Sequence, residues 1–358
     1  MKKVFYIVAM TLLVLILTGV YLLLCASSTP TFKWRMATSW TLDNVHYTKG
    51  AVAICDRVNQ LSNGRLVIEP YTTGSIVGAM EVFDAVSNGT VEIGHSWPGY
   101  WANKKPSFEL FSSIPDQMVL QEWLVWLYGP SRGIDLWSEL YANYDVVPFP
   151  GGLDGPEFGF FTNEPVLTLD DFTDLRLRAT GLAAEVLREL GATIVPLAPG
   201  DIEAAMERGD IDGFEYSTPA VDWLMGLQEL APYVSLPAWH QPSAIAETIV
   251  NLDAWNKLPD DLKAILEAAC KEISMVDYLA YSEGDNAESF DKFVQYGTRI
   301  NVLDTEAMER IAEITNRLAD HRAATDPFYA KVLKSQRDFR SDYRTWELWS
   351  DYKLYPEE

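Results

Sequence analysis

Two distant stretches of the chain, Val82–Pro98 (VFDAVSNGTVEIGHSWP) and Ile202–Pro219 (IEAAMERGDIDGFEYSTP), follow the same succession of helix, glycine, strand and proline. Gly89 and Gly209 fall where the predicted helix ends, a position that favours a residue with a left-handed backbone. The repeated succession predicts two lobes that are built alike. Two unrelated helix–strand units would share some of these features, so that alternative stays open at this point.

Each of the two stretches contains a short predicted strand. Val91 and Ile211 begin these strands, which end at His95 and Glu215. Ligands of open α/β sheets bind beyond the carboxyl ends of the strands. We therefore expect the two strand ends to face one cleft between the lobes.

Strands and helices alternate on either side of these stretches. Phe32–Thr38 and Arg65–Tyr71 are predicted strands, separated by a helix whose apolar positions run from Ala51 to Leu61. The alternation continues to about residue 240, which predicts an α/β architecture with largely parallel strands. A later helix, beginning at Pro259, is long enough to bridge two lobes.

The composition is that of a large globular chain. Of 358 residues, 48% are apolar and 22% are charged, which suits two folded domains. The formal net charge of -23 makes nucleic acid an unexpected partner. No zinc cluster is expected from three Cys and four His. Cys55 and Cys270 lie in amphipathic helical patterns, which favours two buried free thiols over a disulfide.

Residues 1–27 have the composition of an export segment. Lys2 and Lys3 precede an apolar run from Val4 to Cys25 that contains no charge. We interpret it as a signal peptide or an uncleaved N-terminal membrane anchor. Lipidation at Cys25 is a third alternative, which the bulky Leu24 disfavours. All three place the rest of the chain outside the cytoplasm, in the periplasm.

Several short motifs occur in a recognisable order and spacing: Asn63-Gly64-Arg65, Val77-Gly78, Asn88-Gly89-Thr90-Val91-Glu92, Tyr100-Trp101, Lys105-Pro106 and Asp174–Arg178 before Gly181. Together they resemble the solute-binding receptors of tripartite ATP-independent periplasmic (TRAP) transporters. A second set comprises Pro148–Gly152, Gly155-Pro156-Glu157, Gly200-Asp201-Ile202, Ile211–Glu215 and Trp239-His240-Gln241-Pro242. This set most resembles the branch that binds 2-oxo and 2-hydroxy monocarboxylates with a metal ion.

The resemblance implies a receptor rather than an enzyme. Its fold would be the two-lobe periplasmic-binding-protein fold of the α/β class, with a long helix bridging the lobes. Residues 31–153 would form lobe I, completed by roughly 240–280, and residues 154–239 would form lobe II, completed by roughly 281–325. Residues 327–358 would form a helical C-terminal tail. Such receptors capture an organic acid and deliver it to the TRAP membrane subunits.

Arg178 is the candidate anchor for the carboxylate of the ligand. It stands at the end of the predicted strand Leu175–Ala179, where a guanidinium group can grip a carboxylate with two parallel hydrogen bonds. Arg176 lies on the same face of that strand, so the residue pattern alone leaves the choice between the two open. The family resemblance selects Arg178.

The resemblance also implies a cation site at Glu157, Glu215, Tyr216 and Gln241, with Tyr216 contributing its backbone carbonyl and Glu157 also touching the substrate. Oxygen ligands suit Ca²⁺ or Na⁺, and a 2-oxo or 2-hydroxy acid could chelate the same ion. Glu157 stands where the family usually has Gln, and Gln241 where it usually has Glu. The exchange leaves two carboxylates in the site. Roles as loop, turn or solvated residues remain the structural alternatives.

Three further residues are candidates for substrate binding. Tyr100 and Trp101 follow the first strand end and match a family stretch that lines the cleft, where Tyr100 would offer its hydroxyl group. His95 and Trp97 occupy the places in the first copy of the repeat that Glu215 and Tyr216 occupy in the second, and His95 is the third candidate because it would face the ligand across the cleft. For each aromatic residue, packing within the lobe is the alternative.

Other functions compete with that of a receptor. A sugar-acid receptor without a metal stays open, because pocket volume depends on side-chain packing that the sequence does not show. An extracytoplasmic hydrolase with paired carboxylates is a second alternative, and a signalling ectodomain a third. The sequence contains no G-x-S-x-G, H-E-x-x-H or G-x-x-x-x-G-K motif. It does not identify the acid.

The end of the chain carries an aromatic-rich helical stripe: Val332, Gln336, Phe339, Tyr343 and Trp346. Docking on the chain's own lobes is one way to bury it. The resemblance to the oxo-acid branch instead implies a dimer in which the two chains exchange this helix. Asp326-Pro327 provides a break in the helical pattern from which the segment could swing away. The prediction is a homodimer through the C-terminal helix.

Overall fold

The computed structural model describes Met10, residues 31–197 and residues 199–350. The predicted export segment, apart from Met10, and residues 351–358 of the predicted tail lie outside the described residues. In the part that is described, no helix combines the length and apolarity needed to cross a membrane.

Lobe I is built on a five-stranded sheet of order β2-β1-β3-β10-β4. Its strands are β1 (Phe32–Thr38), β2 (Leu66–Tyr71), β3 (Ile93–Ser96), β4 (Val146–Asp154) and β10 (Ala244–Asn251). β1 pairs in parallel with β2 and β3, whereas β10 runs antiparallel to both β3 and β4. The helices α2 (Val52–Leu61), α3 (Val82–Ser87), α5 (Gly133–Ala142) and α9 (Leu252–Lys257) pack against this sheet, and α4 (Leu120–Tyr128) packs against α5.

Lobe II is built on a six-stranded sheet of order β11-β9-β5-β8-β6-β7. Its strands are β5 (Phe160–Thr162), β6 (Arg176–Arg178), β7 (Thr193–Ile194), β8 (Gly213–Phe214), β9 (Tyr233–Leu236) and β11 (Arg299–Val302). Only β5 is antiparallel to its neighbours, β8 and β9. The helices of this lobe include α6 (Gly181–Glu189), α7 (Ile202–Arg208) and α8 (Pro219–Leu224).

The two-lobe α/β prediction is confirmed, with one inverted strand in each sheet as a correction to the parallel pattern. β5 is the first strand after the chain passes from β4 into lobe II, and β10 is the first after it returns from β9. Each of these two strands begins at the cleft edge of its sheet, because the chain crosses between the lobes there, and it therefore runs away from the cleft. The neighbouring strands run towards the cleft, so they pair antiparallel with it.

The repeated glycine positions behave as predicted. Gly89 has φ 77° and Gly209 has φ 68°, so both helices end on a left-handed glycine. Val91 and Ile211 are fully buried, but the strands begin two residues later than predicted, at Ile93 and Gly213.

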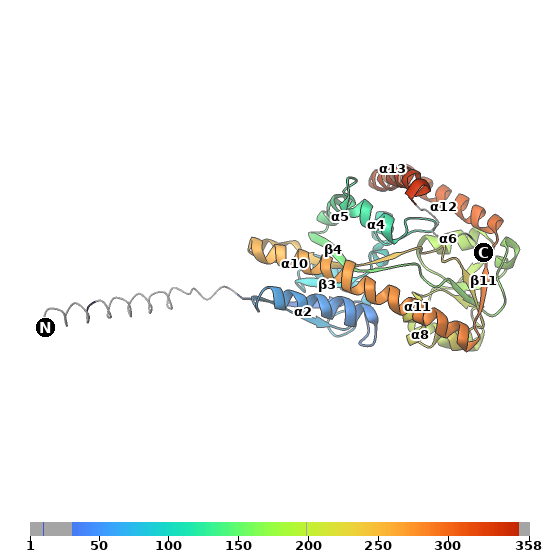
Figure 1. Ribbon diagram of the computed structural model, residues 1–358, viewed down its shortest axis with the longest axis horizontal. Coiled ribbons are helices and arrows are strands. Elements are labelled where there is room, and N and C mark those ends of the chain that lie inside the picture. Colours follow the sequence, from blue (N-terminus) through green and yellow to red (C-terminus); the bar gives the residue numbers. More distant parts are fainter. Residues whose placement is uncertain (1–9, 11–30, 198, 351–358) are drawn as a thin grey trace.

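A long helix joins the two lobes, as predicted (Figure 1). It consists of α10 (Asp260–Glu272), a π-helical turn (Ile273–Asp277) and α11 (Tyr278–Tyr296). α10 packs against α2 and β4 of lobe I, and α11 packs against α8 of lobe II. Pro259 stands at its N-cap, and Gly297, with φ 106°, ends it.

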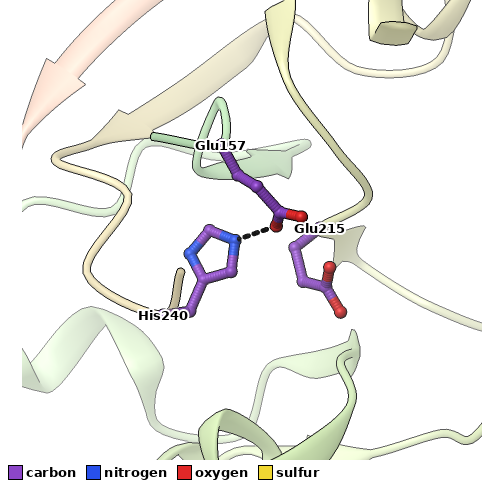
Figure 2. A group of neighbouring side chains, drawn as sticks. All are labelled: Glu157, Glu215 and His240. Atoms are coloured by element: carbon purple, nitrogen blue, oxygen red, sulfur yellow. Dashed lines mark hydrogen bonds and ion pairs between the residues drawn. The ribbon is translucent and has the colours of Figure 1, made fainter. Parts of the chain in front are cut away.

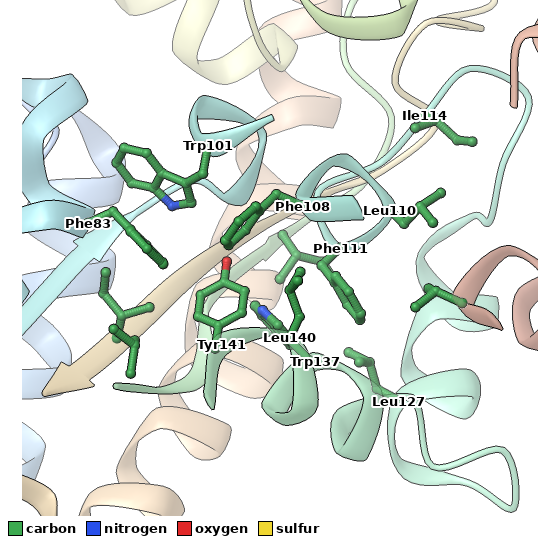
Figure 3. Close-up of a cluster of buried hydrophobic side chains, with 14 of the residues drawn as sticks. Phe83, Trp101, Phe108, Leu110, Phe111, Ile114, Leu127, Trp137, Leu140 and Tyr141 are labelled. Carbon is green, nitrogen blue, oxygen red and sulfur yellow. The ribbon is translucent and has the colours of Figure 1, made fainter. Parts of the chain in front are cut away.

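The core of lobe I uses much of the aromatic content (Figure 3). Phe83 packs against Trp101 with ring centroids 5.3 Å apart, and Phe108 packs against Tyr141 at 5.0 Å. The indole N–H of Trp101 donates to Oε1 of Glu247 at 2.6 Å, and the hydroxyl of Tyr141 donates to Oε2. These aromatic rings therefore build the interior of the lobe. Elsewhere in the lobe, Cys55 and Cys270 are buried free thiols, as predicted.

The C-terminal helices span both lobes. α12 (Thr305–Thr325) packs against α6 of lobe II, and α13 (Pro327–Ser350) packs against α4 and α5 of lobe I. The first half of α13 buries Tyr329, Val332 and Gln336 against the chain's own lobe I. Trp346, further along, is 63% exposed. The predicted stripe is thus buried at its start and exposed towards its end.

Candidate functional site

The carboxyl ends of two adjacent strands of lobe II place the central pair of the site. Strands β6 and β8 pair in parallel, with Arg178 opposite Phe214. Arg178 is the last residue of β6, and Glu215 follows β8 directly. The register therefore brings the guanidinium of Arg178 beside Glu215, as expected for a site at strand ends.

Arg178 is 6% exposed and held rigidly. Its Nη1 donates to the backbone carbonyl of Glu215 at 2.5 Å and to Oε1 of Glu215 at 2.9 Å. Its Nε donates to the carbonyl of Leu197 at 3.4 Å. Because these contacts fix the planar group before any ligand arrives, little conformational freedom remains to be lost on binding.

Arg176 is excluded from the site by its own partners. Its side chain is exposed, and its Nε and Nη2 donate to the two carboxylate oxygens of Asp212 at 2.9 and 2.6 Å. The ion pair lies at the surface of lobe II. Of the two arginines, Arg178 is therefore the one that lies in the buried cluster beside Glu215.

Glu157, Glu215 and His240 form a buried cluster (Figure 2). Each offers one ligand atom, and these atoms all lie within 4.8 Å of one another. Nε2 of His240 lies 3.0 Å from Oε2 of Glu157. Burial raises the pKa of Glu157 well above its ordinary value, and the Glu215 carboxylate adds to this rise. Burial lowers the pKa of His240 to about 4. A cation would favour the ionised form of Glu157, which burial alone disfavours.

The remaining predicted cation ligands lie beside this cluster. The backbone N–H of Glu157 donates to the carbonyl of Gln241 at 3.1 Å. Gln241 lines a small cavity together with Glu215 and His240. The guanidinium of Arg178 lies 6.0 Å from the ring centroid of Tyr216. Buried carboxylate and amide groups next to backbone carbonyls fit a hard cation.

The structure adds two residues that the sequence analysis did not select. His240 was noticed only within a family motif. Asp222, on α8, is fully buried, and neither of its carboxylate oxygens has a hydrogen-bond partner among the described residues. Burial raises the pKa of Asp222 well above its ordinary value, and the charges of Glu157 and Glu215 contribute. Asp222 lies in the first turn of α8, eight residues after the end of β8, and no motif in the sequence singled it out.

The candidates from lobe I separate into two groups. Tyr100 belongs to the surroundings of the cluster, because Arg178, Glu215 and Glu157 all influence its pKa, which burial raises. His95 and Trp101 are engaged inside lobe I. Trp101 donates to Glu247 in the core.

His95 has both ring nitrogens occupied. Nδ1 accepts from the indole N–H of Trp40 at 2.7 Å, and Nε2 lies 2.9 Å from the carbonyl of Gly151. Burial lowers the pKa of His95 to about 3, which keeps the ring neutral. These contacts, like those of Trp101, support a packing role and do not support the predicted contact with a ligand.

A cavity of about 20 Å³ lies between the lobes beside the cluster. Residues of lobe I, residues 180–183 of lobe II and the crossing segment that carries His240 and Gln241 all line it. Its two-lobe walls and its buried charged groups make this cleft the candidate binding site for a small polar ligand.

Residues 36–326 match the family model of bacterial extracellular solute-binding protein, family 7. The chain belongs to this family. A monocarboxylate 2-oxoacid-binding periplasmic protein of Nostoc sp. (strain PCC 7120) is 31% identical over 317 residues, which cover 88% of this chain and 86% of the relative. The resemblance to TRAP receptors is confirmed, and a solute-binding function replaces the hydrolase alternative.

Solved structures of TRAP solute-binding proteins share the fold. One from Colwellia psychrerythraea, with bound calcium and pyruvate, has a TM-score of 0.85 and 30% identity, covering 90% of this chain and 98% of the other. One from Pseudoalteromonas atlantica, with bound sodium and pyruvate, has a TM-score of 0.84 and 29% identity, with coverages of 90% and 97%. One from Bordetella bronchiseptica is a mixed-occupancy dimer with calcium and picolinate, with a TM-score of 0.85, 29% identity and coverages of 91% and 96%.

Proposed function

We propose that this chain is the receptor of a TRAP transporter and captures a 2-oxo or 2-hydroxy monocarboxylate together with Ca²⁺ or Na⁺. The observation that carries the proposal is the buried contact between Arg178 and Glu215 beside Glu157. Similar proteins that bind calcium or sodium with pyruvate support it.

Each group would have a distinct task. Arg178 would grip the carboxylate of the acid, and Tyr100 would donate from its hydroxyl group. Glu157, Glu215, Gln241 and the backbone carbonyl of Tyr216 would hold the cation. The cation would supply positive charge to the carboxylate and to the 2-oxo or 2-hydroxy oxygen.

Charge balance favours Ca²⁺ over Na⁺. Two ionised carboxylates, one guanidinium and one bound monocarboxylate leave an excess of two negative charges. Ca²⁺ cancels this excess, whereas Na⁺ leaves one buried negative charge uncompensated, which is unfavourable in a site that excludes water.

The similar proteins favour a short acid. The cavity of about 20 Å³ has room only for a group the size of a water molecule, so any acid requires the lobes to separate further. Pyruvate bound to two similar proteins supports a short acid, and we place the sugar-acid alternative second.

The cellular setting follows from the family. We propose that residues 1–27 direct export, as a signal peptide or as an anchor, and that the receptor works in the periplasm. Its macromolecular partners would be the TRAP membrane subunits. We retain residues 31–153 and 154–239 as the main parts of the two lobes, with the later segments completing them.

A homodimer is the proposed assembly. Trp346 on α13 is exposed, and the Bordetella bronchiseptica protein is a dimer. Because the first half of α13 is buried in lobe I of its own chain, the outer half carries the proposed contact.

Titration calorimetry with pyruvate, lactate and 2-oxobutanoate tests the function. We expect unconsumed acid to bind in the presence of Ca²⁺ and to bind far more weakly after chelation in sodium-free buffer. Failure of every acid to bind with either ion would reject the proposal, and consumption of an acid would point to an enzyme.

A further inference from the structure

Each carboxylate of the buried cluster has one oxygen that is held by a protein donor. Nε2 of His240 lies 3.0 Å from Oε2 of Glu157 (Figure 2). On Glu215, Oε1 accepts from Nη1 of Arg178 at 2.9 Å and from the hydroxyl of Thr180 at 3.4 Å. The remaining oxygens, Oε1 of Glu157 and Oε2 of Glu215, accept no hydrogen bond from any described residue. Each carboxylate is therefore oriented by one oxygen and keeps the other for a cation.

The hydrogen bond between His240 and Glu157 has only one possible direction when a cation is bound. A carboxylate that ligates a cation is ionised, so it accepts hydrogen bonds and donates none. Nε2 of His240 must then carry a proton and donate to Oε2 of Glu157. Because Nε2 is occupied in this way, and because Ca²⁺ and Na⁺ prefer oxygen, His240 is better suited to orient a ligand than to act as one.

The ring of His240 is itself held in place. It packs edge-on against Phe160, with ring centroids 4.8 Å apart, and against Trp239 at 6.0 Å. The backbone N–H of Glu157 donates to the carbonyl of Gln241 at 3.1 Å. Both the backbone and the side chain of Glu157 are thus attached to the segment that carries His240 and Gln241.

These contacts join the two segments that cross between the lobes. Glu157 lies between β4 and β5, where the chain enters lobe II, and His240 lies between β9 and β10, where it returns. The contact therefore fixes Glu157 before a cation arrives, which reduces the freedom lost on binding. Hydrogen-bond partners of ligating side chains commonly contribute about tenfold to a hundredfold to the affinity for a metal ion.

We infer that His240 is a positioning residue of the proposed cation site, and that it orients the carboxylate of Glu157 so that Oε1 is presented to the cation. The inference rests on the proposed function and adds to it a residue outside the proposed ligand set. His240 acts on the cation through Glu157, and on the acid only through the cation.

His240→Phe removes the donor and keeps an aromatic ring against Phe160. Calorimetric titration of the chelated protein with calcium, in sodium-free buffer, should show an affinity about tenfold to a hundredfold below that of the parent. The affinity for pyruvate at saturating calcium should stay close to that of the parent, whereas a general distortion of the cleft would lower both. His240→Gln, which retains an N–H donor, should recover most of the calcium affinity.

A double substitution tests whether His240 acts through Glu157. In Glu157→Ala the carboxylate is absent, so adding His240→Phe should lower the calcium affinity no further. Trp239→Phe is the matched control, because it changes the adjacent aromatic residue, whose indole N–H has no hydrogen-bond partner among the described residues. This control should keep the calcium affinity of the parent.

Circular dichroism checks the fold of each variant. His240→Asn, whose shorter side chain does not extend to Oε2 of Glu157, replaces His240→Phe if the latter does not fold. If the parent binds sodium and no calcium, the same comparisons are made with sodium.

The outcomes separate this inference from the proposed function. If the parent binds a cation and pyruvate but His240→Phe binds the cation equally well, His240 is not a positioning residue and the receptor function stands. A loss that persists in full in the Glu157→Ala background also overturns the inference, because His240 would then act independently of Glu157. If the parent binds neither calcium nor sodium, with or without pyruvate, both proposals fail.

Discussion

Arg178 and Glu215 are joined twice, because Nη1 of Arg178 donates both to the backbone carbonyl and to the side-chain carboxylate of Glu215. The parallel pairing of β6 with β8 places the two residues together. The contacts that Arg178 makes in lobe II use Nε and Nη1. One residue of the proposed cation site thus orients the residue that would hold the acid, so cation and acid are expected to bind together.

Arg178→Lys should weaken acid binding by about a hundredfold or more. Lys keeps the charge but loses the planar geometry that pairs with a carboxylate. Calorimetry measures the loss, and Arg176→Lys on the same strand is the control because Arg176 pairs with Asp212 at the surface. If the Arg178→Lys variant binds the acid as tightly as the parent, Arg178 is not the anchor.

Glu215→Gln should lower cation affinity and acid affinity together. The substitution removes one of two carboxylates and leaves the shape nearly unchanged. Elemental analysis of the purified protein and calorimetry in chelated, sodium-free buffer measure the two effects. Glu309→Gln, at an exposed position of α12, is the control. Acid binding that is insensitive to chelator, to sodium and to this substitution would remove the cation site.

Arg322→Ala should speed ligand release severalfold. Arg322 donates to Glu109 of lobe I at 2.5 Å and to Glu185 of lobe II at 2.7 Å, so it links the lobes beside the cleft. Loss of this link should favour separation of the lobes. Stopped-flow measurement of release tests the effect. Arg317→Ala is the control, because Arg317 forms an exposed ion pair with Glu189. Equal release rates in all three proteins would contradict it.

Glu247→Gln should change how stability depends on pH. Burial raises the pKa of Glu247 from 4.5 to about 7, although hydrogen bonds from Tyr141 and Trp101 oppose the rise. The stability contributed by this group is complete below pH 4.5 and is lost as pH rises through 7. Because Gln does not titrate, the stability deficit of the variant should shrink between pH 5 and pH 7.5, by about 2 kcal/mol.

Urea unfolding of parent and variant at the two pH values measures this difference. Comparing the free energies of unfolding of parent and variant at each pH cancels the contributions of the other titrating groups, including the neutral buried histidines. Glu309→Gln, at an exposed position of α12, is the control for the substitution itself. A deficit of Glu247→Gln that grows with pH would mean that Glu247 is ionised in the folded core.

Trp346→Glu should convert the proposed dimer into a monomer. The substitution puts a charge on the exposed half of α13 and leaves its buried half, with Tyr329 and Val332, intact. Light scattering of a chain that begins at residue 31 measures the mass at several concentrations. A parent that remains monomeric at high concentration would rule out the dimer.

The local features of the fold could be read from the sequence. Gly89 and Gly209 end helices because a left-handed residue is needed there, and Pro259 precedes the long helix because its fixed φ suits a helix start. Both the helix ends and the helix start depend on residues that are neighbours in the sequence. The motifs that resemble TRAP receptors predicted the family and singled out Arg178, Glu157 and Glu215 as candidate site residues.

Only the tertiary structure decided which candidates meet. Arg176 and Arg178 lie on one face of one strand, and the difference between them comes from the partners Asp212 and Glu215 that adjoining segments supply. His95 is held within lobe I, because Trp40 and Gly151 occupy both of its ring nitrogens.

His240 gained a place in the cluster because the return from lobe II brings it to Glu157, far away in the sequence. Periodicity shows which face of an element is buried. It does not show which distant side chain completes a hydrogen bond there, since that depends on how the lobes pack.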